Sequence, residues 1–189
     1  MSRRARTRGV VPLSPRWASR LRDAEVTAPW DAASPGLVPP GFRGIERSAP
    51  LVRRDLDGAG EDLLGWRMHT RAGLEVAVVP GPAYAGHAHP GEVIALRLGV
   101  GRLRVCAPCR VLEVFEEPDR RGLTYGTLPG HPEAGIERFE VLRAADGALR
   151  LRISGYSRPG SPPVRVGAPV ARIVQERITR RYLRALDER

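Results

Sequence analysis

The chain has 189 residues, of which 42% are hydrophobic and only 5% are aromatic. That length suits one domain with a mainly aliphatic core and is too short for two ordinary domains. The formal net charge is +10, and all 31 basic residues are arginines. Arginine without lysine is more typical of a GC-rich genome than of selection for phosphate contacts, because lysine also binds phosphate well. No apolar run approaches the ~20 residues that cross a bilayer, and no apolar signal segment follows the basic start, so we expect a cytoplasmic protein.

Residues 1–40 are rich in arginine, proline and glycine and show no sustained hydrophobic period. We interpret them as a basic N-terminal tail that is partly disordered, and residues 41–189 as a single domain. Pro39-Pro40-Gly41 marks the transition, because these residues favour extended or turn conformations. A first strand is predicted over residues 42–52.

A helix is predicted over residues 57–70, with Asp57 as its cap. Its leucines and Met68 share one broad face, with Trp66 beside it. Three glycines lower the intrinsic helix propensity by about 1 kcal/mol each relative to alanine. Packing against the rest of the domain must therefore hold this helix together.

From residue 74 onward the apolar pattern changes to the two-residue period of strands. The predicted strands cover residues 74–79, 93–98, 103–115, 122–125, 136–142 and 149–154. Asp146-Gly147 predicts a tight hairpin turn between the last two strands. The alternation over residues 149–154 indicates that one face of the sheet is core and the other is wet.

The last predicted element is a long amphipathic helix over residues 167–187. Its apolar residues recur at steps of three and four, at Val166, Val170, Ile173, Val174, Ile178, Tyr182 and Leu186. Such a stripe needs a surface to cover, and the preceding strands provide one. We therefore predict an α+β fold in which an antiparallel β-sheet closes around the long C-terminal α-helix.

One segment of the chain resembles the signature of a known family. It is Tyr125-Gly126-Thr127-Leu128-Pro129-Gly130-His131-Pro132-Glu133, followed by Gly135, Glu137 and Phe139. This run is similar to the DUF1990 (UPF0548) family of uncharacterised proteins, and the resemblance covers about residues 41–186. Further matches are Trp66-Arg67-Met68, Pro108-Cys109-Arg110-Val111 and Ser157-Arg158-Pro159. The resemblance implies a helix-grip fold of the START, Bet v 1-like (SRPBCC) type, whose cavity between sheet and helix often holds hydrophobic ligands.

Three classes of function stay open. The first is binding of a hydrophobic small molecule or lipid in that cavity. The second is a cyclase- or hydrolase-like enzyme, with Tyr125, His131 and Glu133 as candidate catalytic residues, because a histidine beside carboxylates can act as a general base and a tyrosine can donate a proton. The third is binding of nucleic acid or an anionic surface through the arginine-rich ends, although we expect no specific nucleic-acid recognition.

The signature segment also has a structural interpretation, which we favour. Its glycines permit positive φ and its prolines restrict the backbone, so the segment can simply be a rigid loop. We expect Arg158 to lie near Glu133 or Glu137 and to hold this loop. The residues that suit either ligand contact or loop support are Trp66, Thr127, Glu137 and Arg158.

Two further groups have the spacing of metal ligands. His87 and His89 alternate as on a strand, and Cys106 and Cys109 are spaced as half of a zinc site. Residues i and i+3 of a strand point to opposite faces, however, and no third ligand lies nearby in sequence. We therefore expect neither a metal nor another cofactor. The sequence does not predict an oligomeric state.

Overall fold

The structure is a computed structural model that describes residues 9–31, 36–79, 86–99, 105–160 and 168–187; of residues 168–175 it describes the backbone alone. The elements in chain order are β1 (Val10–Pro12), α1 (Pro15–Leu21), β2 (Arg43–Leu51), α2 (Leu56–Leu64), α3 (Arg67–Arg71), β3 (Glu75–Val78), β4 (Val93–Leu98), β5 (Val105–Glu116), β6 (Arg120–Thr127), β7 (Glu133–Arg143), β8 (Leu149–Pro159) and α5 (Ala168–Ala185).

The strands form one eight-stranded sheet in the order β1-β3-β4-β5-β6-β7-β8-β2. Every neighbouring pair is antiparallel except β1 and β3, which are parallel. The predicted turn at Asp146-Gly147 joins β7 to β8, and Gly147 has a φ of 77° that suits glycine. The predicted α+β class is confirmed, with strands longer than the periodicity alone indicated.

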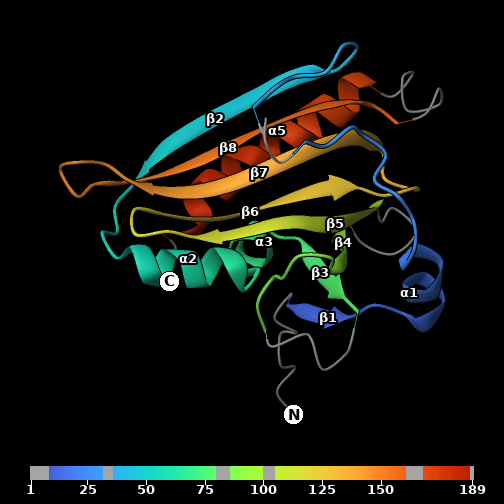
Figure 1. The fold of residues 1–189 in the computed structure, drawn as a ribbon, viewed down its shortest axis with the longest axis horizontal. Helices are drawn as coiled ribbons and strands as arrows, with labels where there is room; N and C mark the ends of the chain where they lie inside the picture. The colour runs from blue at the N-terminus through green and yellow to red at the C-terminus, as the bar shows by residue number, and fades with distance from the viewer. Residues whose placement is uncertain (1–8, 32–35, 80–85, 100–104, 161–167, 188–189) are drawn as a thin grey trace.

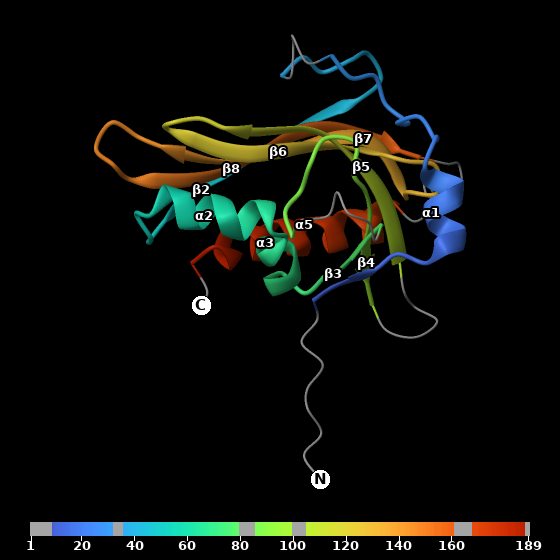
Figure 2. The same cartoon turned by 60° about the horizontal axis from the view of Figure 1, so that its bottom comes forward.

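The sheet curves around helices on one side. Figure 2 shows α2, α3 and α5 beneath the sheet, with α5 running along it, while residues 22–31 and 36–42, between α1 and β2, lie on the opposite side. We call the side toward α2, α3 and α5 the inner face and the opposite side the outer face. In Figure 1 the long strands β6, β7 and β8 lie across α5, which is the predicted wrapping of a sheet around the C-terminal helix.

The main core lies on the inner face, because alternate residues of each strand meet the helices there. Its fully buried members include Leu56, Leu63, Trp66, Met68, Ile94, Leu123, Phe139 and Ile153. Two smaller clusters lie on the outer face. One packs α1 against β3 and β4, and the other packs Ala28, Trp30 and Phe42 against β7 and β8.

Residues 10–21 fall within the predicted tail but form β1 and α1. Leu13 and Leu21 are each only 1% exposed, and the parallel pairing of β1 with β3 gives this segment backbone partners. The sequence pattern missed this order because three residues of strand and seven of helix are too short to show a period. Burial against the sheet, a long-range contact, stabilises them.

The helix predicted over residues 57–70 is two helices. Asp55, rather than Asp57, is the cap of α2, and its side chain accepts the Gly58 amide proton at 2.9 Å. The helix ends at Leu64 with Gly65 as its C-cap, and Trp66 adopts a left-handed conformation with a φ of 63° before α3 begins. A bulky residue in this region is strained, so its fully buried indole must hold it there by packing.

Only part of the predicted face of the C-terminal helix falls on described side chains. Tyr182 and Leu186 are buried at 3% and 1% exposure, and Ile178 packs partly buried against the main core. Val166 lies outside the described residues, as do the side chains of Val170, Ile173 and Val174. The predicted contact of this helix with the core is therefore seen at its C-terminal half.

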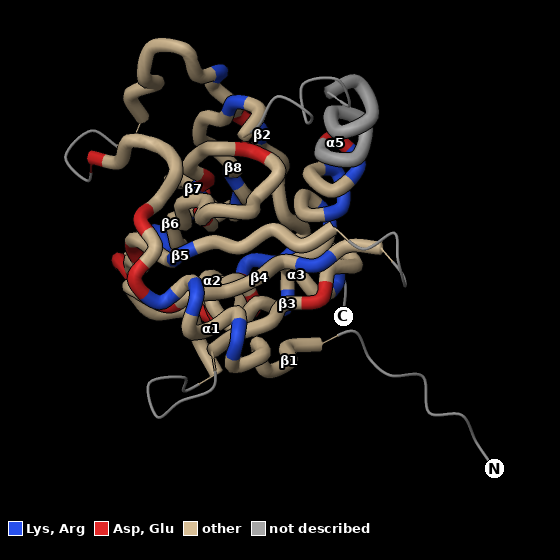
Figure 3. The backbone as a smooth tube through the Cα atoms, turned by 90° about the vertical axis from the view of Figure 1, so that its right-hand side faces the viewer, with Lys and Arg blue, Asp and Glu red and all other residues tan. Residues whose placement is uncertain are grey.

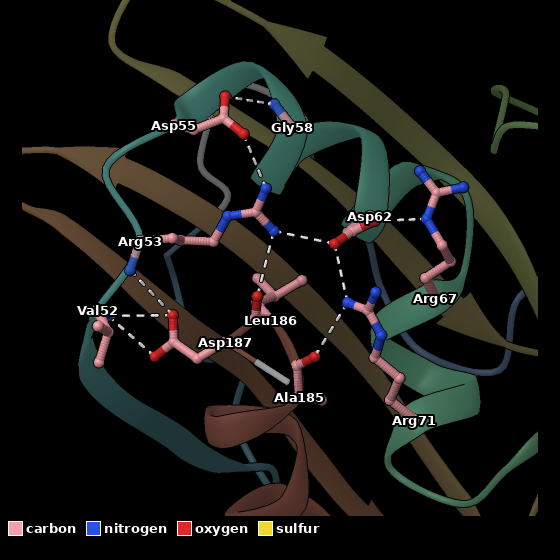
Figure 4. A network of polar contacts seen from close by, with 10 residues as sticks. All are labelled: Val52, Arg53, Asp55, Gly58, Asp62, Arg67, Arg71, Ala185, Leu186 and Asp187. Carbon is pink, nitrogen blue, oxygen red and sulfur yellow. Dashed lines mark hydrogen bonds and ion pairs between the residues drawn. The ribbon is translucent and has the colours of Figure 1, made fainter. Parts of the chain in front are cut away.

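A polar network attaches the C-terminal end of α5 to the rest of the domain, as Figure 4 shows. Asp187 accepts the amide protons of Val52 and Arg53, while Asp62 of α2 contacts the guanidinium groups of Arg53 and Arg71 at 2.9 and 2.8 Å. Arg67 also pairs with Asp62. Arg53 and Arg71 additionally donate to the carbonyls of Leu186 and Ala185, which lie at the negative end of the helix dipole.

Candidate functional site

The signature segment forms the end of β6, a loop and the start of β7. Gly130, with a φ of 98°, shapes the loop, and the His131 amide donates to the carbonyl of Leu128 at 3.0 Å. The register places Tyr125 directly opposite Glu137 and leaves both side chains on the inner face, in line with Phe139. This strand–loop–strand arrangement is the one predicted for residues 125–137.

The central contact of the site joins two of the predicted residues. The Tyr125 hydroxyl donates to Glu137 Oε2 at 2.7 Å. Burial raises the pKa of Glu137 from 4.5 to about 7, although the hydrogen bond from Tyr125 acts in the opposite direction. Burial, followed by the nearby Glu137 carboxylate, also raises the pKa of Tyr125 well above its ordinary value. Glu137 can therefore gain or lose a proton near neutral pH.

Five of the predicted residues line one small cavity of about 40 Å³ on this face. They are Tyr125, Thr127, His131, Glu133 and Glu137, joined there by residues of β2 and β8 such as Ile45, Gly155 and Ser157. A volume of this size holds a few water molecules or the polar end of a larger molecule. The structure thus brings together the residues that the signature suggested.

Three of these residues already have structural contacts. His131 Nδ1 accepts the Glu133 amide proton at 2.9 Å, and burial lowers the pKa of this histidine to about 4, so it is neutral at pH 7. Thr127 Oγ1 accepts the Gly135 amide proton at 2.9 Å and lies 2.6 Å from Thr27 Oγ1. Burial raises the pKa of Glu133, and a hydrogen bond from Ser157 opposes that rise. The contacts of Thr127 and His131 connect side chains of the signature segment to the backbone at the start of β7.

Sequence reasoning missed His69, which lies beside Tyr125 in the core. Its ring is fully buried and contacts the rings of Trp66, Phe139 and Tyr182, with centroids 5.0 to 5.2 Å away. Neither ring nitrogen has a hydrogen-bond partner among the described residues, and the same holds for Trp66 Nε1. Burial lowers the pKa of His69 to about 3, so the ring is neutral. Trp66 directly precedes α3 and His69 lies within it, and their spacing of three residues is the one local signal that could have indicated this pair.

A second buried carboxyl group was also missed. Glu92 precedes β4, and its carbonyl accepts the Val111 amide proton. The residue is 4% exposed, and neither carboxylate oxygen has a hydrogen-bond partner among the described residues. Burial raises its pKa to about 7. Nothing in the local sequence distinguishes Glu92 from a solvated loop residue.

Arg158 lies away from this site. Its register partner is Ala134, so it belongs to the outer face, whereas Glu137 belongs to the inner face. The Arg158 guanidinium lies over the ring of Phe42, 4.6 Å from its centroid. The expected contact of Arg158 with Glu133 or Glu137 is therefore replaced by a cation–π contact with the segment that leads into β2.

The residues with metal-ligand spacing lie apart. Cys109 is buried in the inner core, while Cys106 packs with the cluster beneath α1 on the outer face. His87 Nε2 contacts Glu61 at 2.8 Å, and His89 Nδ1 lies 3.1 Å from the carbonyl oxygen of Pro90. Across the described parts of the chain, no three or more His, Cys, Asp or Glu side chains gather as a metal site would require.

No described helix is long and apolar enough to span a membrane.

The curved sheet around α5, with small α2 and α3 beside it, defines a helix-grip protein of the Bet v 1-like type. Several solved structures share this fold, and three of them serve as examples. They are a hypothetical protein from Helicobacter pylori (TM-score 0.56, 10% identity, 78% of this chain and 88% of that one), a Thalictrum norcoclaurine synthase mutant bound to a transition-state analogue (0.53, 10%, 79% and 97%) and the Zhui aromatase/cyclase from Streptomyces (0.53, 18%, 77% and 91%). At such identities the likeness shows the fold alone.

Residues 23–185 match the family model described as a domain of unknown function, DUF1990, and the chain belongs to that family. A UPF0548 protein from Deinococcus radiodurans is 44% identical over 77 residues, which make up 41% of this chain and 39% of the relative. The matched segment thus spans about two fifths of that curated protein. The resemblance first seen in the signature segment is confirmed.

Proposed function

We propose that this protein binds a small hydrophobic molecule or lipid between the inner face of the sheet and α5, with Tyr125 and Glu137 holding its polar end. The observation that carries the proposal is the hydrogen-bonded pair of these two residues at the wall of the cavity. Burying a carboxyl group costs free energy that one hydrogen bond offsets only in part, and such groups cluster at binding and catalytic sites.

The surroundings of the pair support this proposal. The aromatic rings of Trp66, Phe139 and Tyr182 offer apolar contact area around His69, whose nitrogens are free to accept or donate a hydrogen bond to a polar group. The cavity of about 40 Å³ matches a polar end group, and the apolar body of the ligand would extend along the inner face. The norcoclaurine synthase structure, which shares this fold, is a complex with a transition-state analogue, so the fold can accommodate a small organic molecule.

Native mass spectrometry of the purified protein, followed by solvent extraction, tests this proposal. We expect the wild-type chain to retain an organic molecule and the Glu137→Gln variant to retain several-fold less of it, because the ionisable partner is lost. Arg158→Gln is the matched control, since it removes a charge from the same pair of strands on the outer face. Equal losses in both variants, or no retained molecule and no displaceable hydrophobic probe, would contradict the proposal.

A second candidate function is catalysis on the bound molecule, favoured by the pKa of about 7 for Glu137. A carboxyl group with such a pKa can serve as general acid or base at neutral pH, and the Tyr125 hydroxyl is its hydrogen-bonded partner. Turnover should follow a group with a pKa near 7 and be lost in Glu137→Gln. His131 suits this role less well, because its Nδ1 already accepts the Glu133 amide proton.

The third class, binding of nucleic acid or an anionic surface, has less support. In Figure 3 the basic residues are spread over α1, the strands and α5 rather than gathered on one element. Many of the described arginines are also paired with carboxylates, including Arg53, Arg97, Arg121 and Arg138.

A further inference from the structure

A larger cavity of about 450 Å³ lies on the outer face of the sheet, on the opposite side from the Tyr125–Glu137 site. It is enclosed by residues 36–38 on one side and by β2, β6, β7 and β8 on the other. This volume falls in the range of ~300–1,000 Å³ typical of pockets for small molecules. The side chains that matter to its chemistry are Val38, Arg120, Arg138, Glu140, Arg152 and Tyr156.

The floor of this outer cavity is polar, whereas the neighbouring outer-face cluster around Ala28 and Ile136 is apolar. Glu140 is only 1% exposed and lies opposite Arg152 in the register of β7 and β8. Its Oε2 accepts from Arg152 Nε and Nη2 at 2.8 and 2.7 Å, and its Oε1 lies 3.1 Å from Arg138 Nε. Arg120 Nη1 approaches the same oxygen at 3.7 Å. One buried carboxylate thus fixes three guanidinium groups in place, so the floor is preorganised.

The charges on this floor are balanced. Besides Glu140, Glu113 pairs with Arg138 at 2.6 Å, and Glu117 pairs with Arg120 at 2.5 Å. Three arginines therefore face three glutamates, and the exposed Glu46 lies at the rim. An anion gains little in such a field, because each positive charge is already compensated.

The hydrogen-bonding pattern of the floor also disfavours an anionic ligand. Glu140 Oε1 is buried and makes no hydrogen bond, although two guanidinium groups lie near it. An acceptor in this position requires a donor from the ligand, and a fully deprotonated oxyanion has none to give, whereas every hydroxyl group has one. Arg152 contacts Glu140 through Nε and Nη2, so its Nη1 is not used in that pair and is available as a donor.

The cavity also has an apolar wall. The Tyr156 ring is 4% exposed and packs edge-on against Phe42, with centroids 5.5 Å apart. Its hydroxyl donates to the carbonyl of Pro29, so the phenol group is held in one orientation. Val38, which is 41% exposed, lies on the opposite side. An aromatic ring beside fixed arginine and glutamate side chains suits a molecule with both C–H faces and hydroxyl groups.

We infer that the outer cavity binds a neutral, polyhydroxylated small molecule the size of a mono- or disaccharide. Its hydroxyl groups donate to Glu140 and accept from Arg152, and its C–H face packs against Tyr156 and Val38. Hydroxyl groups are both donors and acceptors, which is what a floor of paired arginines and glutamates requires. This site is separate from the proposed hydrophobic site, because the two lie on opposite faces of the sheet.

Titration calorimetry and ligand-observed NMR on the full chain test this inference with D-glucose, D-galactose, D-mannose, trehalose and inorganic phosphate as probes. At least one sugar should bind saturably. Val38→Trp, which fills the cavity from its exposed side, should weaken that binding tenfold or more. Val52→Trp is the matched control, since Val52 is 87% exposed and is not part of the cavity.

The Glu140→Gln variant tests the charge balance itself. Removal of the shared carboxylate leaves the three guanidinium groups with excess positive charge, so this variant should gain phosphate binding that the wild-type chain lacks. The inference is overturned by the absence of saturable binding for every sugar, by sugar binding that Val38→Trp leaves unchanged, or by phosphate binding to the wild-type cavity. Circular dichroism of both variants verifies that the fold persists.

Discussion

Replacement of Glu137 by glutamine isolates the buried carboxyl group at the centre of the candidate site. Glutamine keeps an oxygen that can accept from the Tyr125 hydroxyl but removes the titration. In the folded wild-type chain burial raises the pKa of Glu137 from 4.5 to about 7. The folded state therefore binds this proton more tightly than the unfolded state, and between these pH values stability falls as pH rises.

The magnitude follows from that shift. At 1.36 kcal/mol for each pKa unit, the move from 4.5 to about 7 corresponds to up to about 3 kcal/mol. Below pH ~4.5 the carboxyl group is neutral in both states and costs nothing; above pH ~7 its full cost is present. The stability of Glu137→Gln relative to wild type should therefore rise by up to about 3 kcal/mol between these two pH values.

The comparison must be a difference between two chains, because other buried groups titrate in the same window. Burial lowers the pKa of His69 to about 3 and that of His131 to about 4, so both bind fewer protons in the folded state. Their contribution to the stability of the folded state increases with pH up to the ordinary histidine pKa of about 6.5, which is opposite in sign to the contribution of Glu137. Glu92, whose pKa burial raises to about 7, acts in the same direction as Glu137 and lowers stability as the pH rises.

Urea denaturation of both chains from pH 4 to pH 8 measures this difference as a change in midpoint at constant m-value. A difference that stays constant with pH, or that falls as pH rises, would refute the reasoning. Tyr125→Phe provides a second measurement, because loss of its hydrogen bond raises the pKa of Glu137 further. Its pH-dependent effect should disappear in the Glu137→Gln background, as a double-mutant cycle would reveal.

Three further predictions concern the fold and the charge of the chain. Asp62→Asn should destabilise the domain by about 1–3 kcal/mol in thermal or urea unfolding, because Arg53 and Arg71 lose a shared and largely buried partner; no loss would show that the network is dispensable. Gly122→Ala should destabilise by about 1–3 kcal/mol or more, since its Cβ would lie 2.2 Å from the Phe139 carbonyl oxygen; a wild-type midpoint would contradict this. Any binding to DNA or RNA should vanish steeply with salt in filter-binding assays, and discrimination of one sequence by more than ~4 kcal/mol would contradict it.

Local patterns in the sequence were sufficient for most of the secondary structure. The two-residue period predicted β3, β4 and the centres of β5 to β8, and the amphipathic stripe predicted α5. The signature segment likewise led to Tyr125, Thr127, His131, Glu133 and Glu137, which line one cavity. These features are readable because neighbours in sequence, or residues opposite one another in a hairpin, make the contacts that define them.

Other features depend on contacts between distant residues and have no local signal. β1 and α1 are too short to show a period and are held by burial against β3 and β4. The break at Trp66 exists because a fully buried indole stabilises a strained backbone conformation. Neither the pairing partner of β1 nor the burial of Trp66 can be inferred from the adjacent residues.

The division is sharpest for the two cavities. Side chains alternate along β7 and β8, so the register of the two strands places Glu137 and Arg158 on opposite faces. That register is set by the hairpin and by the packing of the whole sheet, and not by the residues near Glu137 or Arg158. The unpartnered nitrogens of His69 and the three arginines around Glu140 arise only where a helix or a remote strand closes over them. Residue types and their spacing indicated the helices and strands. Which charged or polar side chains are buried depends on how the sheet and helices pack together, so tertiary packing decided which side chains form sites.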